Sequence, residues 1–411
     1  MKNLLCLVVL LCCAGVSISA QSADILRVAH YNLLKYGDAG CLSLTTKNAR
    51  LKTIFDALQP DVLTVNEMLP SQTAINSLRT NALAFNTSMQ STTFGNSTGS
   101  DIINTLYYNG SKLGYLGHQV ITGNIRDIDV YRLYHLGSTQ PGDTTDLYCL
   151  VAHFKSSQGE SNVAERAGAA QSVVNWLQTH PQVQRYIFSG DFNVYSSTEP
   201  AYQILQQRFD DPSGVTNGWH GFAFAALQTQ SPADGTHPCA VTGGMDDRFD
   251  FILTSPNLYD GSDRIATVAG TYRTFGNDGV SYNDFLQCAA TTSVSASVCT
   301  ALRTASDHLP VTVQLLVQAS TPVAAVGNPR QQCRILGNPV QASVRIRLPE
   351  QYTEQGSWRI LDQLGRVVVQ GNLETAYGNV LEIPTQEWAS GLYVFIFQDG
   401  ANRAMPLRLV R

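Results

Sequence analysis

Polar side chains that could bind a metal ion or move a proton follow several apolar runs of this 411-residue chain. The run "RYIF" leads directly into "SGDFN", which contributes Asp191 and Asn193, and "ILRVAHYN" stops at Asn32. "DVLTVNE" stops at Glu67, and "LYCLVAH" stops at His153. Strands commonly end in polar turns, so each residue alone has an ordinary structural explanation. Their recurrence at successive strand ends predicts one shared site.

Two further segments add to this set. "SDHLP" places Asp307 and His308 just before the apolar run "VTVQLLV", and "DDRFDFIL" embeds Asp250 among apolar residues. A buried carboxylate is costly unless it is paired. We therefore expect Asp250 to hold one ring nitrogen of His308, which leaves the other nitrogen free for chemistry.

Phosphodiester hydrolysis requires the residue types found here. A metal ion must neutralise phosphate oxygens, a water must be positioned, and a donor must stabilise the charge of the transition state. The oxygen ligands Asn32, Glu67 and Asp307 suit Mg²⁺, or Mn²⁺ or Ca²⁺, better than zinc. Asp191 could orient or deprotonate the water, while the Asn193 amide could hold that water or a phosphate oxygen.

The histidines would complete such a site as donors. His308 would face the phosphate, and His153 would be a second donor on the same side. Taken alone, His153 is more often a satisfied core or surface histidine. Lys155 and Arg166 are further candidates for phosphate contacts, and a solvated lysine and a helix-surface arginine are equally good interpretations of them.

The elements that must position these residues alternate between strand and helix, which predicts an α/β domain over 24–318. Apolar residues at helical spacing predict helices over 47–58, where Pro60 follows, and over 162–178. Residues 86–101 are polar and without periodicity, which indicates a surface loop.

Beyond this region the composition changes. Residues 319–333 are rich in Pro, Gly and Ala and are typical of a linker, and residues 334–411 alternate in short runs that predict a small all-β sandwich. At the other end, residues 1–20 have the order of a secretory signal peptide, with a membrane anchor or a buried strand as alternatives. After signal cleavage we expect no transmembrane helix.

Six cysteines remain after the expected signal peptide, and an exported chain with an even number permits disulfides. Cys288 and Cys299 are the favoured pair because they flank a polar stretch. Cys149 lies in an apolar run and is expected to be a core thiol. Without a CxxC motif, a structural zinc site is not expected.

The chain carries a formal net charge of −5, and the acidic residues concentrate in 24–318. A nonspecific grip on a polyanion usually needs a basic surface, so the composition argues against one. A bound divalent cation would reverse the local sign, so a phosphate substrate stays possible.

Through these motifs, residues 24–318 resemble the endonuclease/exonuclease/phosphatase superfamily, which includes pancreatic-type deoxyribonuclease and neutral sphingomyelinases. The resemblance runs through "HYNLL", "DVLTVNEM", "VAHFKSS", "SGDFNVY", "DDRFDFIL" and "SDHLP". It implies a four-layer sandwich of two β-sheets flanked by helices. The implied metal ligands, water-handling groups and phosphate-binding groups are those named above: Asn32, Glu67, His153, Asp191, Asn193, Asp250, Asp307 and His308.

Two positions depart from one branch of this superfamily. Abasic-site enzymes carry an acidic residue where this chain has Leu34, and a tyrosine where it has His153. The histidine is more similar to the deoxyribonuclease and sphingomyelinase branches, which argues against abasic-site repair.

The C-terminal residues 334–411 resemble the sorting domain of type IX secretion in gram-negative bacteria. The resemblance rests on "NPV", "ILDQLGRVV", "GLYVFIFQDG" and the final "LRLVR". It implies the type IX secretion machinery as a partner and a location that is secreted or attached to the bacterial cell surface. A carbohydrate-binding or adhesion module is the alternative.

Three functions are consistent with the sequence. The favoured one is a secreted, divalent-metal-dependent phosphodiesterase, a nuclease that acts on extracellular DNA or RNA. The same chemistry could act on a phospholipid, as in a sphingomyelinase, or on a phosphomonoester. The third is a surface-displayed binding protein on an inactive scaffold. This function is disfavoured because an inactive scaffold has no chemical need for the whole set of polar residues.

Overall fold

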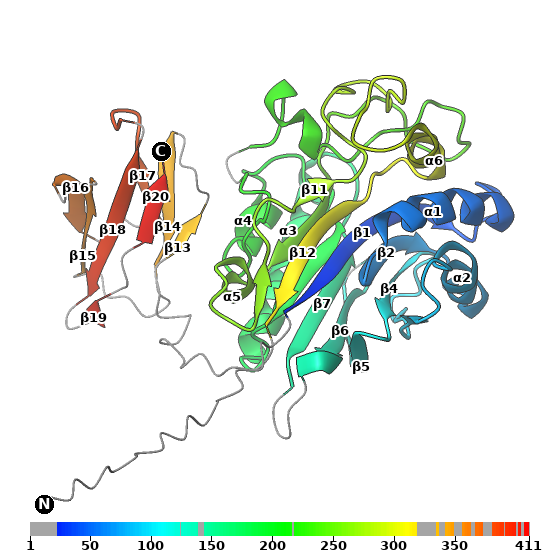
Figure 1. Cartoon of the computed structure of the whole chain (residues 1–411), viewed down its shortest axis with the longest axis horizontal. Helices are drawn as coiled ribbons and strands as arrows, with labels where there is room; N and C mark the ends of the chain where they lie inside the picture. The colour runs from blue at the N-terminus through cyan, green and yellow to red at the C-terminus, as the bar shows by residue number, and fades with distance from the viewer. Residues whose placement is uncertain are drawn as a thin grey trace, which may run out of the picture.

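The computed structural model describes two stretches of the chain (Figure 1). The first is 23–318 without 124, 139–143 and 216–217; the second comprises 334–336, 342–348, 356–362, 366–372, 380–389, 391–399, 402–403 and 407–410. The expected signal peptide (1–20), the expected linker (319–333) and Cys333 lie outside the described residues.

Two β-sheets form the centre of the larger part. The first has the strand order β10-β12-β1-β2-β4-β3, with β11 also paired to β12. Its strands are β1 (Asp24–Tyr36), β2 (Val62–Met68), β3 (Met89–Ser91), β4 (Ile103–Asn109), β10 (Ile265–Thr267), β11 (Arg273–Thr274) and β12 (Val311–Val317). The second runs in chain order through β5 (Leu113–Ile121), β6 (Ile128–His135), β7 (Asp146–His153), β8 (Tyr186–Asp191) and β9 (Asp250–Thr254).

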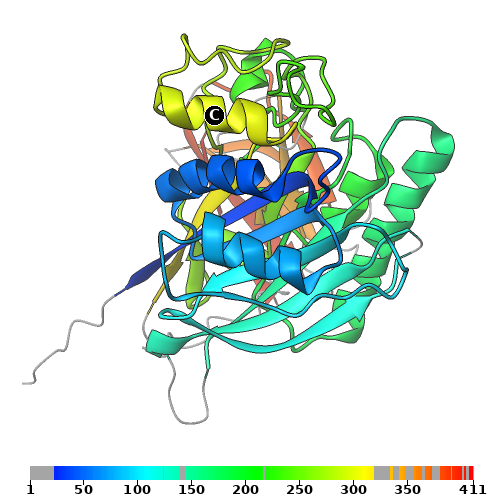
Figure 2. The ribbon, with the colours of Figure 1, turned by 90° about the vertical axis from the view of Figure 1, so that its right-hand side faces the viewer.

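Helices cover the outer face of each sheet. On the first sheet lie α1 (Leu44–Leu58), α2 (Gln72–Ser77) with the π-helical turn η1 (Leu78–Ala82), and α6 (Ala296–Ala305), the face that Figure 2 presents. On the second lie α3 (Glu160–Thr179) and α4 (Pro200–Leu205). Short helical segments η2 (Leu136–Ser138), η3 (Phe222–Leu227) and α5 (Pro256–Tyr259) lie in connections. The expected four-layer α/β sandwich is confirmed.

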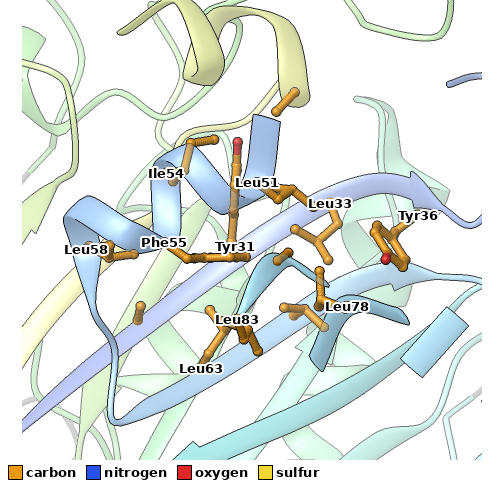
Figure 3. Close-up of a cluster of buried hydrophobic side chains, with 14 of the residues drawn as sticks. Tyr31, Leu33, Tyr36, Leu51, Ile54, Phe55, Leu58, Leu63, Leu78 and Leu83 are labelled. Atoms are coloured by element: carbon orange, nitrogen blue, oxygen red, sulfur yellow. The ribbon is translucent and has the colours of Figure 1, made fainter. Parts of the chain in front are cut away.

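Three apolar clusters hold the layers together. One joins α1, α2 and α6 to the first sheet; there Tyr31 meets Phe55 edge to face at 6.4 Å, and Leu33 and Ile54 pack alongside (Figure 3). A second lies between the two sheets, and a third lies under α3 and α4. The central strands, such as β1, β2, β7, β8 and β9, therefore contribute to two clusters through their alternating side chains.

The cluster between the sheets turns polar at one edge. In β1, Leu26 and Val28 face this layer, and the same row of alternate residues continues through His30 to Asn32, both fully buried. The rows of β2, β7, β8 and β9 likewise pass from apolar residues to polar ones at that edge. These polar residues are Thr64, Asn66, His153, Ser189, Asp191 and Asp250.

Strand direction explains why these ends meet. β1 pairs parallel with β2, and β7 pairs parallel with β8, so four carboxyl ends point to one edge. β9 and β12 run antiparallel to their neighbours, which brings their amino ends to the same edge. The register sets His153 opposite Asp191, and Asp191 opposite Asp250.

Several elements differ from the sequence expectations in their bounds. β1 does not stop at Asn32: it continues to Tyr36 through a register shift against β2. The helix expected from 47 begins at Leu44 because the Ser43 hydroxyl accepts a hydrogen bond from the Thr46 backbone. The expected loop 86–101 contains the short edge strand β3.

Two disulfides cross-link the larger part. The expected pair Cys288–Cys299 is confirmed, and Cys149 is the buried free thiol that its apolar surroundings predicted. A second bridge joins Cys41 to Cys239, 198 residues apart, which the sequence had not indicated. This bridge ties the segment after β1 to the loop before β9.

The C-terminal strands form two further antiparallel sheets, as expected for a small all-β sandwich. One contains β13 (Arg334–Leu336), β14 (Ser343–Arg347) and β17 (Val380–Pro384). The other contains β15 (Ser357–Leu361), β16 (Val367–Asn372), β18 (Leu392–Asp399), β19 (Asn402–Arg403) and β20 (Leu407–Val410). Their shared core includes Ile346, Ile360 and Phe395. Among the helices of the described residues, none is both long and apolar enough to cross a membrane.

Candidate active site at the polar sheet edge

Asn32 lies at the centre of the polar edge and connects the two sheets. Its Nδ2 donates to Glu67 Oε1 (3.1 Å) and to Asp191 Oδ2 (3.0 Å), while its Oδ1 accepts from the Leu34 backbone N–H (3.0 Å). The amide thus bridges the carboxylates of β2 and β8. Its oxygen is already used once, so any metal bond from Asn32 must come from its second lone pair.

Burial shifts the proton affinity of Asp191. The residue is 2% exposed, and burial raises the pKa of its carboxyl to about 7, with His308 opposing and Asp250 and Glu67 adding to the rise. A carboxyl that titrates near neutral pH can both accept and release a proton under physiological conditions.

His153 completes a three-residue group with these carboxylates. Its Nε2 lies 3.5 Å from Asp191 Oδ2 and 3.9 Å from Glu67 Oε1. Burial lowers the pKa of His153 well below its ordinary value, and the charges of Arg126 and His308 act in the same direction. His153 is therefore neutral and has one N–H to donate.

His308 and Asp250 form the expected pair. Nδ1 of His308 lies 2.7 Å from Asp250 Oδ2, and its Nε2 lies 3.6 Å from Asp191 Oδ2. Although burial works against a charged ring, Asp250 and Asp191 raise the pKa of His308 well above its ordinary value. The contacts with His308 and His30 hold the pKa of Asp250 well below its usual range, against the effect of burial. His308 is thus an imidazolium, and its Nε2 also lies 3.2 Å from the side-chain amide of Gln230.

Asp307 is placed beside His308, with Oδ1 at 3.9 Å from His308 Nε2. Its Oδ2 accepts from the Val241 backbone N–H at 2.8 Å. Within the described part of the chain, Oδ1 is buried and has no hydrogen-bond partner. An anionic oxygen in that position is costly unless a cation meets it.

These observations test whether a divalent cation fits. One ligand atom each from Glu67, His153 and Asp191 lies within 4.8 Å of the others, and this group could hold a metal ion. Asp307 is not a member of that group. Glu67 and Asp191 supply hard carboxylate oxygens, which Mg²⁺, Mn²⁺ and Ca²⁺ prefer, and the orphaned Asp307 Oδ1 is a further buried carboxylate oxygen beside His308. The residues present fit such a cation.

Backbone geometry turns the strand ends toward the site. Leu34, Lys35, Glu67 and Asn193 have positive φ values of 47°, 52°, 56° and 49°. Non-glycine residues rarely adopt this region, and such strain is concentrated at functional sites. Local hydrogen bonds support it: the Lys35 N–H donates to Glu67 Oε2 (3.2 Å), and the Asn193 N–H donates to Asp191 Oδ1 (3.1 Å).

The sequence analysis missed a buried chain behind Asp250. His30 Nε2 lies 3.6 Å from Asp250 Oδ1, and its Nδ1 lies 3.0 Å from Thr64 Oγ1, which lies 2.7 Å from Ser189 Oγ. Burial lowers the pKa of His30, so the ring is neutral. Two of these residues, His30 and Ser189, lie two positions before the predicted site residues Asn32 and Asp191. Thr64 lies two positions before Asn66, the strand partner of Asn32. Side chains two positions apart in a strand face the same side, so this spacing could have identified all three.

A second missed network supports Asp191 from its backbone. The Asp191 N–H donates to Asn66 Oδ1 (2.8 Å), and Asn66 Nδ2 donates to Asn104 Oδ1 (2.7 Å). Asn104 Nδ2 in turn donates to Asp129 Oδ2 (2.9 Å). These amides lock the end of β8 against the first sheet.

Two cations near the site have structural roles. Lys47 of α1 is buried and donates to the carbonyls of Leu34 (3.3 Å) and Ala305 (2.5 Å); burial lowers its pKa to about 7. Arg166 was expected at the helix surface or on a phosphate, but it is fully buried and pairs with Glu199. Its Nη1 also holds the carbonyls of Lys155 and Ser157, so it positions the segment after β7.

Comparison with known proteins adds two findings. Residues 334–409 match the family model described as a secretion system C-terminal sorting domain. No curated protein matches the chain.

Solved structures are similar to the larger part at low identity. One is an endonuclease/exonuclease/phosphatase family protein from Bacteroides thetaiotaomicron, at 15% identity over 72% of this chain and 99% of that chain, with a TM-score of 0.47. Another is D. rerio TDP2 complexed with single strand DNA product, at 18% over 71% and 99%, with a TM-score of 0.48. A third is the mannosyl-6-phosphatase Bt3783 of B. thetaiotaomicron, at 16% over 71% and 99%, with a TM-score of 0.45.

The first of these structures bears the name of the superfamily that the sequence motifs resemble. At these identities the likeness concerns the fold alone, and the description of the fold rests on the sheets and helices given above. The C-terminal match is specific. Residues 334–409 are a secretion system C-terminal sorting domain, which marks the chain for secretion or attachment at the cell surface.

Proposed function

We propose that this protein is a secreted, divalent-metal-dependent phosphodiesterase and that its substrate is extracellular DNA or RNA. The observation that carries the proposal is the convergence of Asp191 with the His308–Asp250 pair at one sheet edge, next to Glu67 and His153. A base, a charged donor and a carboxylate-rich cation site are the parts that phosphoester hydrolysis needs.

The cation would be held by Glu67 and Asp307, with Asn32 as a further oxygen ligand. When bound, it would neutralise phosphate oxygens and so lower the cost of attack by water. Mg²⁺ is the proposed ion because the ligands are hard oxygens; Mn²⁺ and Ca²⁺ share that preference.

The chain's own residues would carry the proton and the phosphate. Asp191, with its pKa near neutral, accepts a proton from a water that the Asn193 amide orients. The His308 imidazolium donates a hydrogen bond to a phosphate oxygen, and Asp250 keeps that ring charged and oriented. Neutral His153, whose Nε2 lies 3.5 Å from Asp191 Oδ2, donates a second hydrogen bond to the phosphate.

The test is to incubate the mature protein and Mg²⁺ with plasmid DNA, RNA, sphingomyelin and a phosphomonoester in parallel. We expect nucleic acid to be cleaved fastest, EDTA to stop the reaction, and Asp191→Ala and His308→Ala each to abolish it. Activity that survives EDTA, or that persists in both variants, would contradict the proposed site. Preferred cleavage of sphingomyelin or of the phosphomonoester would contradict the proposed substrate.

A further inference from the structure

A cavity of about 280 Å³ opens beside His153, which is one of its lining residues. It lies between the segment that joins β5 to β6 and one face of α3. Its lining includes Arg126, Lys155, Ile125, Glu165, Gly168 and Ser172. Its size is close to that of small-ligand sites in proteins.

Two cations stand on the wall nearest the site. Arg126 Nη1 donates to the carbonyls of His153 (3.4 Å) and Phe154 (3.3 Å), and its buried Nε has no hydrogen-bond partner among the described residues. Lys155 lies two residues after the end of β7, and its Nζ donates to the neighbouring Ser156 carbonyl at 3.1 Å. This wall is suited to an anion that lies next to the reacting phosphate.

The rest of the lining has a different character. Ile125 is a large apolar side chain of the lining that is 39% exposed. The opposite wall is α3, where a Cβ built on Gly168 would meet no atom within 4 Å, so the helix leaves space for a ligand. Glu165 and Ser172 add polar groups on the same helix.

We propose that this cavity binds the nucleotide unit next to the scissile phosphodiester, an inference that rests on the proposed function. Its adjacent phosphate would face Arg126 and Lys155, and its base would pack on Ile125 with its polar edge toward Glu165 and Ser172. A lipid chain would need a continuous apolar lining, which cations and a carboxylate interrupt here.

Gly168 permits a sharp test. Gly168→Leu fills the open space without a clash and replaces a poor helix former by a good one, so the variant should fold at least as stably as the wild type. Lys155→Gln removes one cation at nearly constant shape. Gln178→Leu, an exposed position on the same helix outside the cavity, is the matched control.

The experiment has two readouts. Binding of a short oligothymidylate is measured in EDTA, and Mg²⁺-dependent hydrolysis is compared between that oligonucleotide and bis(p-nitrophenyl) phosphate, which has no nucleotide unit. We expect Gly168→Leu and Lys155→Gln each to weaken oligonucleotide binding by about tenfold and to raise KM for it, with hydrolysis of the small diester and the melting temperature unchanged. Gln178→Leu should behave as the wild type.

Unchanged oligonucleotide affinity in both cavity variants would overturn the inference. So would an equal loss toward both substrates, because that would show damage to the catalytic centre and not to a subsite. If the wild type hydrolyses neither substrate, the proposed function is wrong, and the binding measurement in EDTA still decides whether the cavity takes a nucleotide.

Discussion

At the scale of single residues, the site depends on charges that are buried together. Asp250 is fully buried between His308 and His30 and is the anion that keeps His308 charged. A carboxylate in that position orients the ring and favours its protonated form.

Asp250→Asn should therefore lower kcat for phosphodiester hydrolysis by about 10²–10⁴-fold, the usual contribution of a positioned acid or base. Asp56→Asn, an exposed position on α1, should leave the rate unchanged. Initial rates with Mg²⁺, together with melting temperatures for both variants, check this. A rate for Asp250→Asn within about twofold of the wild type would show that the pair does not matter for the chemistry.

The raised pKa of Asp191 predicts how the stability of the metal-free protein depends on pH. Its folded pKa of about 7 lies above the value near 3.8 expected for the unfolded chain, so folding takes up a proton between these limits. Its contribution to stability is complete below about pH 4 and is lost as the pH rises through about 7.

Replacing Asp191 by Asn removes that titration. In EDTA, the melting temperature of the wild type should fall more steeply between about pH 5 and about pH 8 than that of Asp191→Asn. Parallel curves for the two proteins would mean that the Asp191 carboxyl titrates in the folded state much as it does in the unfolded chain.

The residues that could be predicted from sequence are those at the ends of apolar runs. Asp191, His153 and Glu67 were visible because a polar side chain directly after a buried strand is a local signal. Asn104 was not, and neither were the partners of His30, because those contacts are fixed by the sheet pairing and by the contact between sheets. Lys47 was hidden in an ordinary amphipathic helix, since only the fold brings the Leu34 and Ala305 carbonyls to its ammonium group.

At the scale of elements, the strand rows and one disulfide set the geometry of the site. The bridge Cys41–Cys239 ties the segment after β1 to the loop that contains Val241, whose N–H binds Asp307. Sequence could not predict this pair, because its partners are 198 residues apart and no local pattern relates them. The short pair Cys288–Cys299 was predictable from its spacing and polar surroundings.

Cys41→Ser with Cys239→Ser should lower the free energy of unfolding by about 2–5 kcal/mol, since the bridge closes a long loop. It should also reduce kcat/KM, because Asp307 loses a fixed backbone donor. Cys288→Ser with Cys299→Ser is the matched control, which should lose stability and keep more of its activity. Denaturant unfolding and initial rates measure both, and equal activity in the two double variants would contradict the link to Asp307.

At the scale of the whole molecule, the chain combines a candidate hydrolase domain with a C-terminal sorting domain. The sorting domain at 334–409 marks the chain for secretion or surface attachment. The net charge of −5 offers no general attraction for a polyanion, so binding of nucleic acid should depend on the cation site and on local contacts.

Deletion of residues 334–411 should abolish export and leave the hydrolytic activity of the remaining chain intact, because the proposed site lies wholly within 24–318. Fractions of medium, cell surface and lysate from a bacterium with this secretion system, assayed for the protein and for nuclease activity, measure the outcome. Normal export of the shortened chain would show that the export signal lies outside residues 334–411. Loss of activity would show that the site in 24–318 depends on the C-terminal region.

The central claim is that the polar sheet edge holds a divalent cation. Anomalous scattering from crystals of the mature protein soaked in Mn²⁺ tests it most directly. We predict one strong peak about 2.0–2.6 Å from a Glu67 carboxylate oxygen, at the edge shared with Asp191 and Asp307, and its loss in Glu67→Gln. No peak at this edge, or a peak that persists unchanged in Glu67→Gln, would contradict the claim.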